Sequence, residues 1–162
     1  MPVQIEPTKF ASQGEIGIVV SRYNENITSR LLEAAVETLL ECGVDASRQR
    51  VVWVPGAWEI PIVTQKLLDR AEILGVITLG AVIRGETTHD VHINRSVSQA
   101  LMQISLAAKK PVAFGVLTTN NLEQAINRAG GNVGNKGQEA ANALIEVMAS
   151  LDTIGTDVIG GI

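Results

Sequence analysis

Short runs of aliphatic residues alternate along the chain with longer segments that have the periodicity of helices. The aliphatic runs are rich in Val and Ile and are bounded by Gly, Pro or polar residues, a pattern that predicts buried strands. Four strands are predicted, over residues 16–20, 51–54, 73–83 and 112–117. Because these runs alternate with helices and are apolar throughout, we expect an α/β fold, a three-layer α/β/α sandwich around a four-stranded parallel sheet.

A helical pattern follows each predicted strand. The first helix has Asn26 as its predicted N-cap, apolar residues every four positions from Ile27 to Leu39, and an end at Gly43. The other helical segments are predicted at about 61–70, after residue 88, at 122–128 and from the end of a Gly-rich loop at 130–137 to about residue 151.

The whole chain, residues 1–162, is predicted to be a single domain with two distinct ends. The segment 3–10 is β-rich but interrupted by Pro7, which favours an edge strand or an arm, and residues 1–13 are assigned to this N-terminal arm. Residues 153–162 include Gly160 and Gly161 and are expected to form a flexible tail.

Composition narrows the class of protein. The chain carries 13 Lys and Arg against 17 Asp and Glu without a basic cluster, which disfavours general nucleic-acid binding. No apolar run approaches the roughly 20 residues of a membrane span, and the start lacks the layout of a signal peptide, so no membrane association and a cytoplasmic location are expected. Cys42 is the single cysteine, which excludes a disulfide framework and a cysteine-cluster zinc site.

Aromatic residues are scarce, so their positions are informative. The five are Phe10, Tyr23, Trp53, Trp58 and Phe114. In open parallel sheets ligands bind beyond the carboxyl ends of the strands, so the loops after the strands are the candidate site. Trp53 lies within a predicted strand and is expected to be structural, whereas Trp58 in a loop could stack on a flat heterocycle.

His89 and His92, the two histidines, lie three residues apart at the start of a predicted helix. Neighbours at this spacing share a helix face, so a metal pair is an alternative to a single proton-transferring imidazole. No third ligand is evident, so no metal is expected, and His92 is interpreted as a solvent-exposed residue. His89 lies where a loop enters the helix and is the candidate acid or base, because imidazole exchanges protons near neutral pH.

Thr87 and Thr88 open the same helix close to Gly85. Free backbone N–H groups, the positive end of the helix dipole and hydroxyl donors suit an anion such as phosphate, and simple N-capping explains the two threonines equally well. The negative charge of Glu86 disfavours phosphate binding at this position unless the Glu86 side chain points away from the site.

Four sequence blocks lie at the ends of the predicted strands. They are RYNENIT at 22–28, WVPGAWEIP at 53–61, LGAVIRGETTH at 79–89, and FGVLTT at 114–119 with EQAI at 123–126, RAG at 128–130 and GNKG at 134–137. Their order and spacing over about residues 14–151 resemble one family, the 6,7-dimethyl-8-ribityllumazine synthases of riboflavin biosynthesis.

The resemblance implies a flavodoxin-like fold and a transferase. The reaction condenses 5-amino-6-ribitylamino-2,4-pyrimidinedione with 3,4-dihydroxy-2-butanone 4-phosphate to give 6,7-dimethyl-8-ribityllumazine, phosphate and water, the penultimate step of riboflavin biosynthesis. An amine forms an imine with the ketone, phosphate is eliminated, and a second amine closes the ring. These steps need proton transfer and orientation rather than a protein nucleophile, and no metal or organic cofactor is implied.

The resemblance also assigns roles to residues. His89 would be the proton shuttle, and Arg128 would be the cationic partner of the phosphate. Gly85, Glu86 and Thr87 would hold the phosphate through backbone and hydroxyl groups. The other substrate-binding residues would be Tyr23 and Trp58 flanking the pyrimidine, Gly56 and Ala57 through their backbone, Glu59 at the ribityl chain, Val82 and Ile83 at the ring edge, and also Asn24 and Ala81. A neighbouring subunit would supply Phe114, Lys136 and Glu139.

Three positions depart from the family pattern. Tyr23 replaces the usual Phe and adds a hydroxyl that needs a partner. Glu86 stands where a small residue is more common. After His89 the family usually has an aromatic, an acidic and an aromatic residue, whereas this chain has Asp90, Val91 and His92, so the surroundings of His89 differ.

The resemblance further implies a homo-oligomer. The family forms pentamers, with the N-terminal arm joining the sheet of a neighbour. The short loop at 129–137 is similar to that of members whose twelve pentamers close into a 60-subunit shell, while a free pentamer or a decamer stays open. Such a shell could enclose riboflavin synthase as a partner.

Two other functions stay open at this point. An archaeal-type riboflavin synthase would have a similar fold, but its reaction uses no phosphate, which Gly85, Thr87 and Arg128 together argue against. A non-catalytic, flavin-binding shell protein is disfavoured by the presence of both His89 and Arg128, although the three residues after His89 keep it open.

Overall fold

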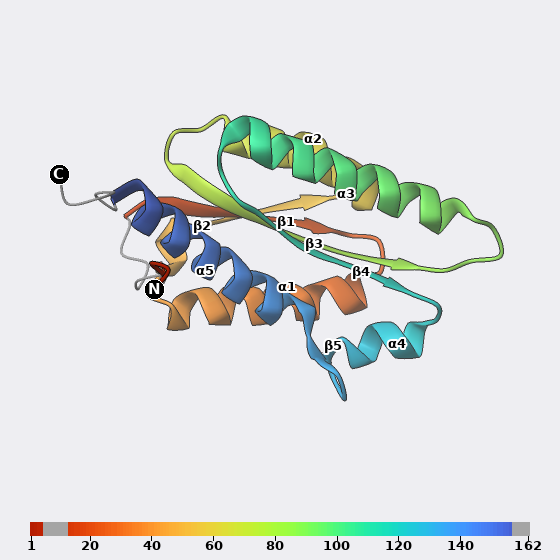
Figure 1. The fold of residues 1–162 in the computed structure, drawn as a ribbon. Helices are drawn as coiled ribbons and strands as arrows, with labels where there is room; N and C mark the ends of the chain where they lie inside the picture. The colour runs from red at the N-terminus through yellow and green to blue at the C-terminus, as the bar shows by residue number, and fades with distance from the viewer. Residues whose placement is uncertain (5–12, 157–162) are drawn as a thin grey trace.

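A twisted parallel sheet lies at the centre of the protein (Figure 1). The computed structural model describes residues 1–4 and 13–156. The four strands are β1 (Glu15–Ser21), β2 (Gln49–Val54), β3 (Ile73–Ile83) and β4 (Val112–Thr119), in the order β2-β1-β3-β4. The predicted strands are confirmed, and this order, with all neighbours parallel, is that of a flavodoxin-like fold.

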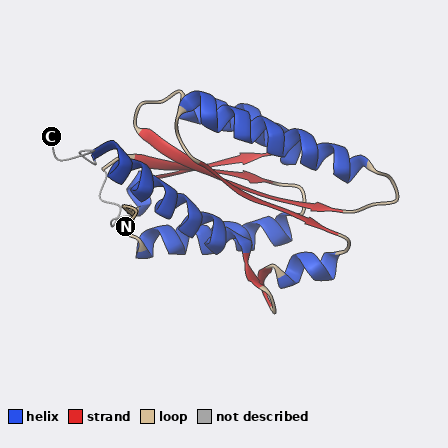
Figure 2. Ribbon diagram, in the orientation of Figure 1, coloured by secondary structure: helices blue, strands red, loops and turns tan. Residues whose placement is uncertain are grey.

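Helices cover both faces of the sheet (Figure 2). One face carries α1 (Glu25–Glu41) and α5 (Lys136–Thr156), and the other carries α2 (Ile60–Leu68) and α3 (His89–Ala108). Short elements complete the chain: η1 (Ala46–Arg48), η2 (Ala57–Glu59) and α4 (Leu122–Asn127). The chain runs from β1 outward to β2 and then back past β1 to β3. Because parallel crossovers are right-handed, this reversal of direction puts α1 and α2 on opposite faces of the sheet.

The alternation of side chains along β1 builds the two cores. Ile16, Ile18 and Val20 face the core under α1 and α5, and Val19 faces the core under α2 and α3. All four side chains are fully buried. The central strands are therefore apolar at every position because both of their faces are covered.

The start of α1 differs from the prediction. The helix begins at Glu25, so its N-cap is Asn24 rather than Asn26. Asn24 has a left-handed backbone with φ of 62°, and its side chain does not cap the helix. Its Nδ2 atom instead donates to the carbonyl oxygen of Ala81 at 2.9 Å. This bond joins the loop after β1 to the end of β3.

The segment predicted as a Gly-rich loop contains a small antiparallel hairpin of β5 (Ala129–Gly131) and β6 (Gly134–Asn135). Asn135 then starts α5, because its Oδ1 atom accepts from the backbone N–H of Gly137 at 2.8 Å. The helix runs past the predicted end near residue 151 to Thr156, so the beginning of the expected tail is helical. The rest of that tail, and residues 5–12 of the expected arm, lie outside the described residues.

The helices α1 and α5 approach each other closely at Gly137. A Cβ atom on this residue would lie 2.0 Å from the carbonyl oxygen of Leu31. Within the described part of the chain, no helix is both long enough and apolar enough to span a membrane.

Candidate active site

A hollow of about 410 Å³ lies beyond the carboxyl ends of β1, β2 and β3. The chain leaves β1 and β3 toward opposite faces of the sheet, and such switch points are where open α/β sheets bind ligands. The predicted site residues that line the hollow are Tyr23, Gly56, Ala57, Trp58, Ala81, Val82, Ile83, Gly85, Thr87 and His89. Loops that are far apart in the sequence therefore meet in one place, as predicted from the strand ends.

Two exposed aromatic side chains mark the mouth of the hollow. Tyr23 is 74% exposed and Trp58 is 62% exposed. Trp58 belongs to the short helix η2, whose loop is closed by the backbone N–H of Gly56, which donates to Glu59 Oε2 at 2.9 Å. Trp53, in contrast, packs against the core under α1 and α5. Two open ring faces at one mouth suit the stacking of a flat heterocycle.

The amino end of α3 opens into the same hollow. Thr88 is the N-cap and makes no side-chain capping bond, while Thr87 Oγ1 accepts from the backbone N–H of His89 at 3.3 Å. A Cβ atom on Gly85 would meet nothing within 4 Å, so the approach to this end is open. Glu86 is exposed and does not line the hollow. The arrangement offers an anion the positive end of a helix, and Asp90, in the first turn of that helix, is the one carboxylate among the residues that line the hollow.

The structure separates the two histidines. His89 lines the hollow, whereas His92 is exposed and does not. Across residues 1–4 and 13–156, no three His, Cys, Asp or Glu side chains are grouped as metal ligands would be. Of the two histidines, His89 alone is among the residues that line the hollow.

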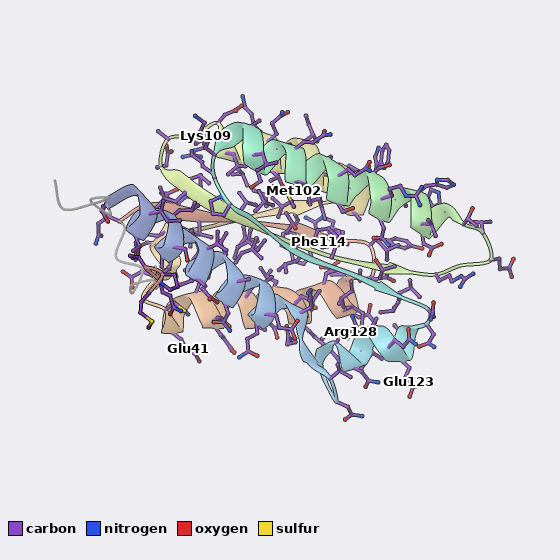
Figure 3. The ribbon with its side chains drawn as sticks, in the orientation of Figure 1. Glu41, Met102, Lys109, Phe114, Glu123 and Arg128 are labelled. Carbon is purple, nitrogen blue, oxygen red and sulfur yellow. The ribbon has the colours of Figure 1, made fainter. Side chains whose placement is uncertain are left out.

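Seven predicted site residues do not line the hollow. They are Asn24, Glu59, Glu86, Phe114, Arg128, Lys136 and Glu139. Asn24 and Glu59 hold the loops around the hollow in place, through their hydrogen bonds to Ala81 and Gly56 respectively. Phe114 lies on the edge strand β4, and Arg128 lies at the end of α4, on the side of the sheet that carries α1 and α5 (Figure 3). Phe114 lines a second hollow together with Asp90 and Val91, the residues that follow His89, whereas Arg128 lines neither hollow.

Three residues that were given no site role line the hollow as well: Pro55, Asp90 and Ile93. Asp90 and Ile93 follow His89 by one and four positions in the first turns of α3. The helical spacing of i and i+4 could have indicated Ile93, because it places that residue on the same face as His89.

A comparison with protein families matches the model of 6,7-dimethyl-8-ribityllumazine synthase to residues 13–152. The chain belongs to this family. The lumazine synthase match includes every strand, loop and helix that lines the hollow, together with α4 and the hairpin.

Curated relatives that carry the name 6,7-dimethyl-8-ribityllumazine synthase agree with this assignment. The protein of Rhodopirellula baltica is 48% identical over 135 residues, 83% of this chain and 87% of its own. That of Pediococcus pentosaceus is 48% identical over 143 residues, 88% of this chain and 92% of its own. That of Thermus thermophilus is 43% identical over 153 residues, 94% of this chain and 98% of its own.

Proposed function

We propose that this chain condenses 5-amino-6-ribitylamino-2,4-pyrimidinedione with 3,4-dihydroxy-2-butanone 4-phosphate to form 6,7-dimethyl-8-ribityllumazine, phosphate and water. The observation that carries the proposal is that two exposed aromatic rings, an open helix amino end and His89 line one hollow in a chain of the lumazine synthase family. Each part suits one component of the reaction.

The aminopyrimidine would bind between Tyr23 and Trp58. Its polar ring edge would meet backbone groups of Gly56 and Ala57, and Val82 and Ile83 would contact its apolar edge. All six residues line the hollow, whose lining is predominantly apolar. Glu59 lies just behind and would hold the ribityl chain. An apolar slot with a few fixed polar groups orients a flat ring while excluding water.

The phosphate substrate would lie at the amino end of α3. Gly85 and Thr87 would donate through backbone N–H and hydroxyl groups, and the helix dipole favours the negative charge. Glu86 would contribute through its backbone, because the residue is exposed and is not among those that line the hollow.

His89 would carry protons between the reacting groups. As the amine nitrogen bonds to the ketone carbon, the nitrogen loses protons and the ketone oxygen gains them and leaves as water. Loss of a proton from the carbon next to the imine then allows the phosphate to depart with the electron pair of its C–O bond. An imidazole suits both directions of transfer, because it gains and loses a proton near neutral pH.

The site is completed, in this proposal, by a second copy of the chain. Phe114, Arg128, Lys136 and Glu139 do not line the hollow of their own chain. We place them at the hollow of a neighbouring copy, with the Arg128 guanidinium on the phosphate. A ring of five copies closes such a head-to-tail contact, and twelve rings would form a 60-subunit shell, in the cytoplasm and able to enclose riboflavin synthase.

The proposal is tested by mixing the purified protein with both substrates. Formation of the lumazine is followed by absorbance, and phosphate release is measured in parallel. We expect both products in equal amounts. Absence of lumazine above the uncatalysed background would refute the proposal, and riboflavin formation from added lumazine would instead identify a riboflavin synthase. Light scattering of the same sample distinguishes a pentamer from a shell.

A further inference from the structure

Asp90 is a buried carboxylate for which residues 1–4 and 13–156 provide no hydrogen bond or ion pair. The residue is 8% exposed, and its Oδ1 atom makes no hydrogen bond within the described residues. Leaving a buried carboxylate oxygen unpaired costs folding free energy, so such an atom needs an explanation. A ligand that binds and donates a hydrogen bond is one.

A capping hydrogen bond at the helix end does not account for Asp90 Oδ1. Acidic residues in a first helical turn commonly accept from free backbone N–H groups. At the start of α3, however, the backbone N–H of His89 donates to Thr87 Oγ1, and no described group donates a hydrogen bond to Asp90 Oδ1. Arg95, five residues further along α3, forms no ion pair with Asp90 in the described part of the chain.

The position of Asp90 points to the substrates. It lines the hollow beside His89 and Ile93. Among the side chains that line this hollow, Tyr23, His89 and Asp90 are the ones that can gain or lose a proton. Asp90 follows His89 directly in the chain, so it lies at the end of the hollow where proton transfer is proposed.

Charge decides which of the two substrates Asp90 can hold. A carboxylate repels a phosphate and attracts N–H donors, and the aminopyrimidine carries two neighbouring amino groups. We propose that the Asp90 carboxylate binds the aminopyrimidine by accepting a hydrogen bond from the amino group that attacks the ketone. This inference rests on the proposed function and adds a specificity-determining contact at a position where the chain departs from the family pattern.

The test compares Asp90→Ala with the unaltered protein. We expect the KM for the aminopyrimidine to rise about tenfold or more, as loss of a hydrogen bond to a charged group does, while the KM for the phosphate substrate stays within about twofold. Binding of the aminopyrimidine alone, followed by tryptophan fluorescence, should weaken by the same factor. Asp90→Asn keeps an acceptor oxygen and should show a smaller rise. Asp152→Ala, at an exposed position on α5, is the control and should leave both KM values unchanged.

Thermal unfolding without substrate gives a second readout. Replacing a buried charge that has no hydrogen-bond partner should leave the melting temperature of Asp90→Asn equal to or higher than that of the unaltered protein. If Asp90 had a structural role, the melting temperature of this variant would be lower. The inference is overturned if Asp90→Ala binds the aminopyrimidine as tightly as the unaltered protein, or if the KM for the phosphate substrate falls instead. Failure of the unaltered protein to form lumazine would refute the proposed function, a result distinct from an active protein whose Asp90 variants behave normally.

Discussion

His89 and His92 are neighbours on α3 with different surroundings, since only His89 lines the hollow. Replacing His89 by Ala should lower kcat by about 10²–10⁴-fold, the usual contribution of a positioned proton-transfer group. His92→Ala is the matched control and should change kcat by less than about twofold. Steady-state rates of lumazine formation measure both. Equal losses in the two variants would contradict the assignment of His89.

Tyr23 should act through its ring rather than its hydroxyl. Tyr23→Ala is expected to raise the KM for the aminopyrimidine roughly five- to tenfold, because a stacked ring contributes about 1 kcal/mol. Tyr23→Phe keeps the ring and should leave this KM nearly unchanged. A Phe variant as impaired as the Ala variant would show instead that the hydroxyl binds substrate.

Residue positions in the loops were predictable where the loops follow strands. Tyr23, Trp58 and His89 were assigned to one site because parallel strands end at one edge, and all three line the hollow. The sequence shows Asp90 only as a departure from the family pattern, because the interest of this residue comes from its burial and from the missing hydrogen-bond partner of its Oδ1 atom. Neither property can be deduced from residue type.

At the scale of the elements, the contact between α1 and α5 depends on Gly137. Gly137→Ala would place a Cβ atom 2.0 Å from backbone oxygen of Leu31, so the helices must move apart. We expect a loss of about 2 kcal/mol or more in the free energy of unfolding, as in overpacked cores. Gly155→Ala in the same helix has open space and should be neutral or stabilising by up to about 1 kcal/mol. Denaturant unfolding compares the two, and similar stabilities would contradict the close approach.

The strands were predictable because buried parallel strands are continuous runs of Val, Ile and Leu, as Ile73–Ile83 illustrates. The hairpin at 129–135 was not, because its strands have two or three residues and mostly consist of Gly and Asn, which carry no hydrophobic alternation. The predicted N-cap of α1 was wrong because Asn24 and Asn26 are both residues of a type that caps helices. The helix begins after Asn24 because that residue has a left-handed backbone, which the sequence does not specify.

At the scale of the whole molecule, His89 and Arg128 are proposed to meet only between copies. Arg128→Ala and His89→Ala should each be poorly active alone. When the two variants are co-expressed and assemble randomly, roughly a quarter of the sites combine an intact His89 with an intact Arg128 from another copy. Lumazine formation should therefore recover to about that fraction. Co-expressed variants that stay inactive despite assembling together would show that both groups act within one chain.

The proposed sharing of the site between two copies of the chain also explains why the candidate site could be predicted only in part. Loop residues of one chain converge through the topology of the sheet, whereas Phe114 and Arg128 lie on an edge strand and on a short helix away from the hollow. In the proposed function, their relation to the hollow depends on how copies of the chain pack together, which neither strand order nor helical periodicity encodes.

The bond from Asn24 to Ala81 also limits how such a site can diversify. The left-handed backbone of Asn24 is adopted most readily by Gly, Asn and Asp, and of these three only Asn has a side-chain N–H that can donate to the carbonyl of Ala81. Its neighbour Tyr23 has an ordinary backbone and a side chain that is 74% exposed. Position 23 can therefore vary without loss of the fold, whereas position 24 cannot. In a mutant library randomised at position 23, we expect more folded variants that retain the hollow than in a library randomised at position 24.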